Sequence, residues 1–336
     1  MLYHIPIEPY KTRYTADWIQ QFESEFKQHN VDFVTVLGPK TNDTVSSGGV
    51  LDSCSTYIYK FSQLSQIIEL ILNNKIHEDD ILFFSDLWFP GLESLFYIRN
   101  MLKIKFKIAG VFHAGTYDPA DFTCRNGMRN WGKFLESCWF EEIDDIFLAT
   151  SFHKELLLKN SYIDENVKEK FLSKLHITGL PFYAQDLRTT YMNNTTKEDI
   201  IVFPHRLDTE KHPELFDKLE QWLTQNNINC KCIKTIESTK SREEYFKLLA
   251  RSKVMISFAD QETFGYSTLE SMALDNIVIV PNKLSYVETV PSSYRYNTID
   301  EAFKLVKQSI LNYTNPNYDL SKWKNSISNM IDILYK

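Results

Sequence analysis

A loop with two carboxylates is the first feature of the sequence that suggests chemistry. The segment 257–282, SFADQETFGYSTLESMALDNIVIVPN, contains Glu262 and Glu270 with seven residues between them. Its pattern predicts a strand, a loop that holds Glu262, and a helix with Glu270 about one turn inside it. Ser267 or Thr268 would suit the N-cap of that helix, and the exposed amides of a helix start favour an anion such as a diphosphate.

A second segment supplies cations. The segment 200–216, IIVFPHRLDTEKHPELF, is a buried strand followed by His205, Arg206 and Lys211. At the end of a parallel strand, an arginine fork and a lysine charge can neutralise a diphosphate leaving group. Taken alone, each segment has an ordinary explanation: carboxylates on a solvated helix, or a salt bridge where a helix begins. Together they favour a nucleotide site.

The surrounding elements predict how these residues are positioned. Short β-rich runs alternate with longer segments of helical period, which is typical of parallel sheets covered by helices on both faces. The expected strands are Leu2–Ile7, Val31–Leu37, Ile81–Ser85, Lys107–Phe112, Ile146–Ala149, Leu175–Ile177, Ile200–Phe203, Cys230–Ile236, Val254–Ser257, Ile277–Val280 and Arg295–Tyr296. The expected helices are Ala16–His29, Phe61–Asn73, Leu92–Leu102, Pro213–Asn226, Arg242–Ala250, Ser267–Leu274, Ile299–Tyr313 and Leu320–Tyr335.

This alternation predicts an α/β protein with two Rossmann-like, doubly wound domains facing a central cleft. Ligands of such sheets bind at the carboxyl ends of the strands. We expect an N-terminal domain over residues 1–183 and a C-terminal domain, which holds both charged segments, over residues 184–319. Residues 320–336 would form a helix that crosses back to the first domain.

Composition limits the class of protein. The 336 residues carry a net charge of −7, so a nucleic-acid partner would need a local basic patch. The five cysteines include no CxxC pair and no companion histidine cluster, which argues against a disulfide framework or a zinc site. The N-terminus lacks the pattern of a signal peptide, and no apolar run approaches the roughly 20 residues that span a bilayer. We therefore expect a cytoplasmic protein without membrane insertion.

The two charged segments resemble the nucleotide-sugar half of retaining GT-B glycosyltransferases of the family 4 type. The family pattern is Gly-Arg-Leu and then Lys. It is followed by two glutamates with seven residues between them, and those seven residues include Phe-Gly. The matching residues here, in the same order, are Arg206-Leu207, Lys211, Glu262, Phe264-Gly265 and Glu270. One departure is that His205 replaces the glycine before the arginine.

The resemblance implies a role for each residue of the donor site. Arg206 and Lys211 would bind the diphosphate, Glu262 the hydroxyls of the donor sugar, and Glu270 the ribose. The remaining loop residues would border the sugar or the phosphates, and they are Thr263, Phe264, Gly265, Thr268 and Leu269.

The resemblance also implies retention of the anomeric configuration without a protein nucleophile. The diphosphate itself would take the acceptor proton while the two cations stabilise its charge. Glu262 and Glu270 are therefore not an acid/base pair of the glycosidase kind. The nucleotide sugar is a co-substrate, and neither a metal nor another cofactor is expected.

The first half of the chain would hold the acceptor. His113 follows an expected strand and resembles the family position that faces the donor sugar, although a hydrogen-bonded core imidazole would look the same. Asp118 would orient the acceptor or the histidine, or would form a turn before Pro119. Near the first strand, a polar and aromatic group would suit a ring-bearing acceptor, or would be a helix start with a buried tryptophan: Glu8, Tyr10, Arg13, Tyr14 and Trp18.

Two further stretches add acceptor candidates. Asp86 and Trp88, with Phe89, follow the strand at 81–85 and would line the site or the core. The stretch 123–140 mixes basic and aromatic residues, which would grip an extruded base and its phosphates or form a plain amphipathic helix: Arg125, Arg129, Lys133, Trp131 and Trp139. A second small basic patch would come from Lys103, Lys105 and Lys107.

Two finer resemblances point to nucleic acid. The segments 241–271, 281–291 and PHRLDTEKHPE look like the transferases that mannosylate queuosine in tRNA. Over almost the whole chain, and most in IPIEPYKTRYT, SDLWFPGLES and FHAGTYDPADF, the sequence resembles phage-encoded glycosyltransferases of hypermodified DNA. Those enzymes attach a sugar to 5-hydroxymethylcytosine or 5-hydroxymethyluracil. For this protein we expect the donor to be a UDP-sugar rather than another nucleotide sugar. The location would then be the host cytoplasm.

Two alternatives to a DNA-base transferase stay open. One is a transferase that acts on tRNA or on a bacterial glycan or lipid precursor. The other is a noncatalytic protein that binds a nucleotide sugar and transfers it to no acceptor. The sequence indicates no obligate protein partner and does not distinguish between donor sugars, nucleotides, acceptor bases or oligomeric states.

Overall fold

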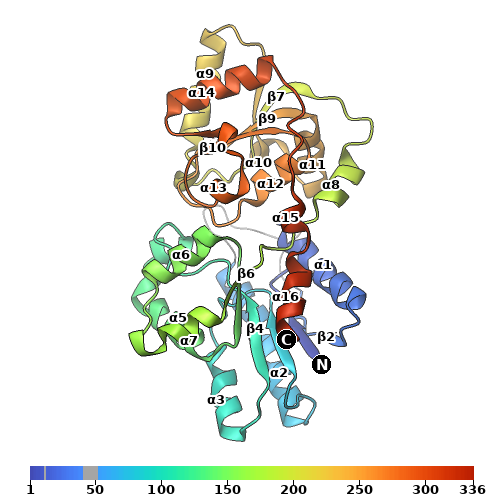
Figure 1. Ribbon diagram of the computed structural model, residues 1–336, viewed down its shortest axis with the longest axis vertical. Coiled ribbons are helices and arrows are strands. Elements are labelled where there is room, and N and C mark those ends of the chain that lie inside the picture. Colours follow the sequence, from blue (N-terminus) through green and yellow to red (C-terminus); the bar gives the residue numbers. More distant parts are fainter. Residues whose placement is uncertain (11–12, 41–51) are drawn as a thin grey trace. The chain divides into compact units, whose positions relative to one another are not determined.

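The computed structural model describes residues 1–10, 13–40 and 52–336 (Figure 1). The chain divides into two compact units. The first unit joins Met1–Pro181 to the C-terminal segment Asn325–Lys336, and the second is Phe182–Lys324. Each unit is an α/β structure around one parallel sheet. The predicted fold class is therefore confirmed.

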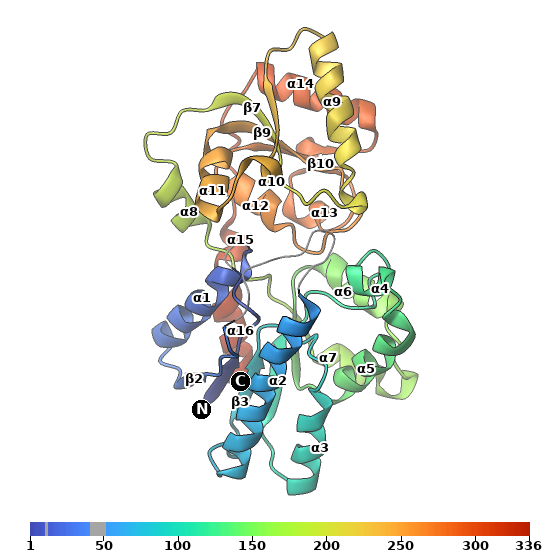
Figure 2. The ribbon, with the colours of Figure 1, turned by 180° about the vertical axis from the view of Figure 1, so that it is seen from behind.

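The first unit contains a six-stranded parallel sheet in the order β2-β1-β3-β4-β5-β6. Its strands are β1 (Leu2–Ile5), β2 (Phe33–Thr35), β3 (Ile81–Phe84), β4 (Lys107–Val111), β5 (Asp145–Leu148) and β6 (Leu175–Ile177). Its helices are α1 (Thr15–Gln28), α2 (Ser53–Leu72), α3 (Glu93–Leu102), α4 (Phe122–Arg125), α5 (Arg129–Glu142), α6 (Ser151–Asn160), α7 (Lys168–Ser173) and α16 (Ser326–Leu334), with the 3-10 turn η1 (Glu165–Val167). Helix α16 packs beside α1, as both ribbon views show (Figures 1 and 2).

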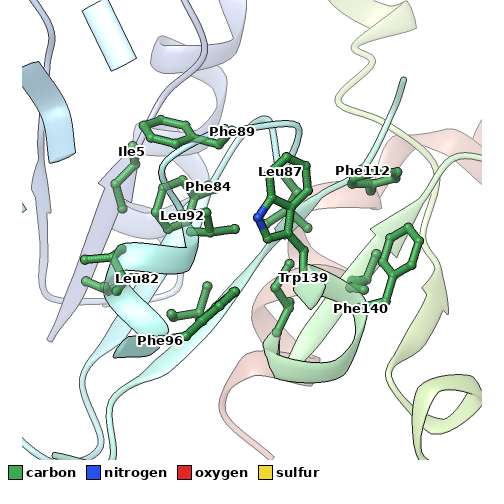
Figure 3. Close-up of a cluster of buried hydrophobic side chains, with 14 of the residues drawn as sticks. Ile5, Leu82, Phe84, Leu87, Phe89, Leu92, Phe96, Phe112, Trp139 and Phe140 are labelled. Carbon is green, nitrogen blue, oxygen red and sulfur yellow. The ribbon is translucent and has the colours of Figure 1, made fainter. Parts of the chain in front are cut away.

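The alternation of side chains along β3 explains the core of this unit. Leu82 and Phe84 point to one face of the sheet, where Figure 3 shows them gathered with Leu87 and with Trp139 of α5. Phe83 points to the other face, and its ring lies 5.1 Å from that of Phe22 in α1. Both faces are buried because helices cover both, as expected for a parallel sheet.

The second unit contains a five-stranded parallel sheet in the order β11-β10-β9-β7-β8. Its strands are β7 (Glu198–Phe203), β8 (Lys231–Lys234), β9 (Ser252–Ile256), β10 (Ile277–Pro281) and β11 (Arg295–Tyr296). Its helices are α8 (Ala184–Tyr191), α9 (Pro213–Gln225), α10 (Thr235–Ser238), α11 (Arg242–Arg251), α12 (Tyr266–Ala273), α13 (Tyr286–Thr289), α14 (Ile299–Leu311) and α15 (Ser321–Lys324), with the 3-10 turns η2 (Thr209–Lys211) and η3 (Ser292–Tyr294). Helices α9 and α14 pack together and bury Leu219 and Val306 (Figure 1).

Several predicted element ends are wrong, and caps explain two of them. Helix α2 begins at Ser53 rather than Phe61, because Asp52 caps it by accepting a 2.9 Å hydrogen bond from the Ser55 amide. Helix α12 begins at Tyr266 after Gly265, whose φ of +86° suits glycine.

The other differences also come from local structure. The predicted N-cap of α12 at Ser267 or Thr268 is wrong, since both residues lie inside that helix. Strand β8 ends at Lys234 because α10 starts at the next residue, and the C-terminal segment forms two helices rather than one. None of the described helices is both long and apolar enough to cross a bilayer.

Two buried histidines predict how stability depends on pH. Burial lowers the pKa of His4 to about 3 and that of His153 to about 3. Each of these histidines is neutral in the folded state, and its pKa in the unfolded chain is about 6.5. Below that pH, unfolding is accompanied by uptake of a proton. The contribution of each histidine to the unfolding free energy is therefore fully present above that pH and is lost as the pH falls. Each histidine should cost about 1.4 kcal/mol of unfolding free energy at a pH of about 5.5.

Urea unfolding at a pH of about 5.5 and at a pH well above about 6.5 tests this pH dependence of stability. His4→Gln should remove one histidine's share of the pH dependence, whereas the exposed control His77→Gln should leave it unchanged. An unfolding free energy of the unmodified chain that stays constant between the two pH values would contradict the prediction.

Candidate active site

The loops after two adjacent strands bring Lys211 and Glu262 together. Lys211 follows β7 and Glu262 follows β9, and these strands are neighbours in the parallel sheet, so both side chains lie at its carboxyl edge. The Lys211 ammonium lies 3.6 Å from a Glu262 oxygen and donates to the carbonyl of Gln261. The other Glu262 oxygen accepts a 3.0 Å hydrogen bond from the Gly265 amide. The Glu262 carboxylate is thereby held in front of the start of α12.

Arg206 is the more exposed of the two cations. Its side chain is 42% exposed and pairs with Asp208 at 2.9 Å and with Glu210 at 3.6 Å. The amide of Asp260 donates to the Glu210 carbonyl at 2.8 Å and joins the two loops. The loop after β7 thus carries a partly exposed guanidinium and a nearly buried ammonium, which suits an incoming diphosphate.

Two residues that were not predicted from the sequence, Arg242 and Tyr245, hold the Glu270 carboxylate. Arg242 and Tyr245, both from α11, contact different oxygens of its carboxylate at 3.2 Å and 3.0 Å. Burial, and then the charge of Glu270, raises the pKa of Tyr245 well above its usual value, so its hydroxyl stays a donor. The neighbours Phe264, Thr268 and Leu269 are buried.

His205, which stands where the family has glycine, is buried beside the two cations. Burial lowers its pKa well below the usual value, and Lys211 and Arg206 lower it further. Its ring lies edge-on to Phe203 at 5.1 Å, and its Nε2 has no hydrogen-bond partner among the described residues. The imidazole is therefore neutral and adds no charge to the anion site.

In the first unit, the structure brings Asp86 and His113 together with a residue that sequence reasoning missed, Lys60 of α2. The Lys60 ammonium lies 2.7 Å from Asp86, and the His113 Nδ1 atom lies 3.7 Å from the other oxygen of that carboxylate. Burial would raise the pKa of Asp86, but Lys60 and then His113 outweigh it, so the pKa is lowered. Burial also lowers the pKa of His113, against the opposing charge of Asp86.

The polar and aromatic group near β1 is less accessible than predicted. Glu8, Tyr10 and Trp18 are at most 1% exposed, so they form no open surface for a ring, whereas Arg13 and Tyr14 are half-buried. Trp18 packs edge-on against His113 at 5.8 Å, which fits the alternative of a buried tryptophan at the helix start. Burial raises the pKa of Glu8.

Most of the predicted acceptor connection has a structural role. Arg129 donates to the carbonyls of Thr116 at 2.8 Å and Asn160 at 2.6 Å, and both bonds tie its guanidinium to the chain rather than leaving it for a phosphate. Trp88 is half-buried, and its indole donates to Glu136 at 3.1 Å.

Of the remaining acceptor candidates, one stabilises a turn and the others lie on the surface. Asp118 is buried and accepts a 2.9 Å bond from the Ala120 amide, as the turn alternative predicts. Arg125 is exposed, as is Trp131. Lys107 begins β4 and therefore lies at the amino edge of the sheet, away from Asp86 and His113. Lys103 caps the end of α3, so the three lysines of the predicted patch at 103–107 do not lie along one strand.

The site contains no cluster of the kind that binds a metal ion. Across residues 1–10, 13–40 and 52–336, no group of three His, Cys, Asp or Glu side chains is close enough to hold one. The charged side chains that the sequence predicted for this site, Arg206, Lys211, Glu262 and Glu270, all lie in the loops and helix that follow β7 and β9.

Solved structures identify the architecture. A sucrose-phosphate synthase from Thermosynechococcus elongatus aligns over 99% of this chain and 98% of its own, with a TM-score of 0.59 at 13% identity. A UDP-forming trehalose-phosphate synthase from Burkholderia vietnamiensis aligns over 99% and 94%, with a TM-score of 0.58 at 10% identity. The fold is GT-B. At these identities the likeness concerns the GT-B fold alone.

A curated relative gives a second similarity. The chain is 25% identical over 214 residues to a tRNA-queuosine alpha-mannosyltransferase from Drosophila melanogaster. The match covers 51% of this GT-B chain and 57% of the relative, so the chain spans little more than half of that protein's length. No family model matches.

Proposed function

We propose that the protein is a retaining glycosyltransferase that moves a sugar from a nucleotide sugar, preferably a UDP-sugar, to the hydroxyl of 5-hydroxymethylcytosine or 5-hydroxymethyluracil in DNA. One observation carries the donor half of this proposal. Lys211 and Glu262 meet at the carboxyl edge of the second sheet, and Arg206 follows the same strand as Lys211. GT-B neighbours support the same class, including a trehalose-6-phosphate structure from E. coli bound with UDP-2-fluoro glucose, with a TM-score of 0.57 at 12% identity.

The proposed chemistry assigns each donor residue one task. The bond between the anomeric carbon and the diphosphate breaks as the acceptor oxygen bonds to the same face of the sugar. The acceptor proton passes to the leaving diphosphate, whose charge Arg206 and Lys211 stabilise. Glu262 binds sugar hydroxyls, and Glu270, oriented by Arg242 and Tyr245, binds the ribose. No protein nucleophile or metal is required.

The proposed acceptor half rests on His113 and Asp86. Both follow neighbouring strands, β4 and β3, and are partly accessible, with side chains 14% and 11% exposed. His113 would contact the sugar, and Asp86 would lie behind it. Arg125, the last residue of α4, and Trp131 of α5 are both exposed, and they are our candidates for contacts with a phosphate and a base.

A tRNA acceptor is the second candidate, because the Drosophila relative is a tRNA-queuosine mannosyltransferase. Mass spectrometry of nucleosides separates the two candidates. The protein would be incubated with a panel of nucleotide sugars and with DNA containing 5-hydroxymethylcytosine, 5-hydroxymethyluracil or neither, or with queuosine-containing tRNA.

We expect a mass gain of one sugar on a hydroxymethyl base only. A gain on queuosine alone would move the acceptor to tRNA. Tight binding of a nucleotide sugar without hydrolysis or transfer to any acceptor, glycans included, would contradict the enzyme and favour a binding protein.

A further inference from the structure

Four titratable side chains with little exposure lie near one another in the first unit. Lys60 is 5% exposed, Glu8 is fully buried, and Asp86 and His113 lie beside them at the carboxyl ends of β3 and β4. Burying an ammonium is costly unless it is paired and hydrogen-bonded. We therefore expect the charge of Lys60 to have a role beyond packing.

Every contact of Lys60 fixes its ammonium in one place. It lies 2.7 Å from an Asp86 oxygen, donates to the Trp88 carbonyl at 2.8 Å, and lies 5.4 Å from the centre of the Phe89 ring. Helix α2 is itself pinned one turn later, where the Gln63 amide donates to the carbonyls of Pro6 and Val36, both at 2.9 Å. These contacts hold the ammonium beside Asp86.

Asp86 in turn faces His113. One oxygen of Asp86 takes the Lys60 ammonium, and the other accepts a 3.1 Å bond from the Trp88 amide and lies 3.7 Å from the His113 Nδ1 atom. That Nδ1 atom is buried and has no hydrogen-bond partner in the described chain. A shift of roughly half an ångström would bring it into the range of an N–H···O bond, and such bonds often tighten when a substrate binds.

We propose that Lys60 is a positioning residue that keeps Asp86 charged and oriented to accept the Nδ1–H of His113. The Nε2 atom of His113 then carries no proton and accepts a hydrogen bond from a hydroxyl of the sugar or the acceptor. Only the identity of that hydroxyl rests on the proposed function; the Lys60–Asp86–His113 arrangement does not.

The surrounding charges support this assignment. The charge of Lys60 acts on Asp86, which pairs with it, and on Glu8, and the environments of the two carboxyl groups move their pKa values apart: burial raises the pKa of Glu8, whereas Lys60 and His113 lower that of Asp86 despite its burial. These shifts favour the neutral form of Glu8 and the charged form of Asp86. The charged groups that act on His113 are Asp86, which favours its protonation, and Lys60 and Arg13, which oppose it.

The tautomer of His113 tests the proposal directly. The full chain would be labelled with ¹⁵N-histidine, and the ring signals of His113 would be assigned by their loss in His113→Gln. The ring nitrogens report which of them carries the proton, because the tautomer follows the hydrogen bond that the ring makes. We expect the Nδ1–H tautomer in the unmodified protein, without any substrate. The Nε2–H tautomer of His113 in the unmodified protein would overturn the proposal. This result is measured in the unmodified protein, so it does not depend on whether a variant of Lys60 or Asp86 folds.

Lys60→Met should shift His113 toward the Nε2–H tautomer. The control Gln63→Leu, on the same helix, removes two buried hydrogen bonds but leaves Lys60 and Asp86 in place, so it should keep Nδ1–H. An unchanged tautomer in Lys60→Met would overturn the proposal. Should Lys60→Met fail to fold, Asp86→Leu makes the same test from the other partner.

Kinetics separate this inference from the proposed function. In Lys60→Met, sugar transfer should fall by about 10- to 100-fold, the loss typical of removing a group that orients a site residue, with little change in UDP affinity. A tautomer shift in a protein that transfers no sugar would keep the positioning role and remove the transferase. Sugar transfer at the unmodified rate in Lys60→Met would remove the positioning role and keep the transferase.

Discussion

Replacing Lys211 with methionine is expected to lower sugar transfer by at least about 10²-fold, the loss typical of one preorganised electrostatic contact. The ammonium is nearly buried, with a side chain 7% exposed, so its charge acts on the diphosphate with little screening by water. Methionine keeps most of the length and apolar volume of the side chain and removes the charge. Affinity for UDP, measured by calorimetry, should fall together with turnover.

A second variant, Arg206→Ala, and a control variant at an exposed lysine make this test specific for the diphosphate site. Arg206→Ala should also lower turnover by at least about 10²-fold. The control Lys218→Met makes the same charge change on the exposed side of α9 and should alter neither UDP affinity nor turnover. Unchanged kinetics in both Lys211→Met and Arg206→Ala would remove the assigned diphosphate site.

The donor loops could be predicted because their information is local. Two continuous stretches of sequence hold these residues: a strand followed by Arg206 and Lys211, and a loop and helix that carry Glu262 and Glu270. Alternating strands and helices then place both stretches at the same edge of one sheet. What the pattern could not supply was the side-chain state, such as the buried and neutral ring of His205.

The residues that orient the site could not be predicted, because tertiary packing alone brings them to it. Lys60 lies in the middle of a helix, and its sequence neighbours give no sign that a later strand will place Asp86 against it. Arg242 looks like an ordinary charge in the first turn of α11. Arg129 fits a nucleic-acid pattern by residue type, yet its guanidinium donates to two backbone carbonyls, that of Thr116 and that of Asn160 at the end of α6.

The pair of Arg242 and Glu270 yields the second large prediction, a loss of stability together with a loss of donor affinity. Their side chains are 19% and 7% exposed and lie 3.2 Å apart, so removing the arginine leaves a buried carboxylate without its cation. Arg242→Leu should lower the unfolding free energy by about 3 kcal/mol, as breaking a buried ion pair does. Urea unfolding measures this loss, and UDP affinity should fall because the carboxylate is no longer oriented.

A double variant separates the two effects. Arg242→Leu/Glu270→Leu removes both charges, and replacing a buried pair by apolar residues is often neutral, so most of the lost stability should return. UDP affinity should not return, because a leucine cannot bind ribose hydroxyls; we expect it to stay at least about tenfold weaker, the effect of one hydrogen bond to a charged group. Glu270→Gln alone, which keeps the shape of the side chain, should show the same weakening of UDP. A double variant that binds UDP as tightly as the unmodified protein would show that Glu270 is a structural partner of Arg242 and Tyr245 and not a ligand of the ribose.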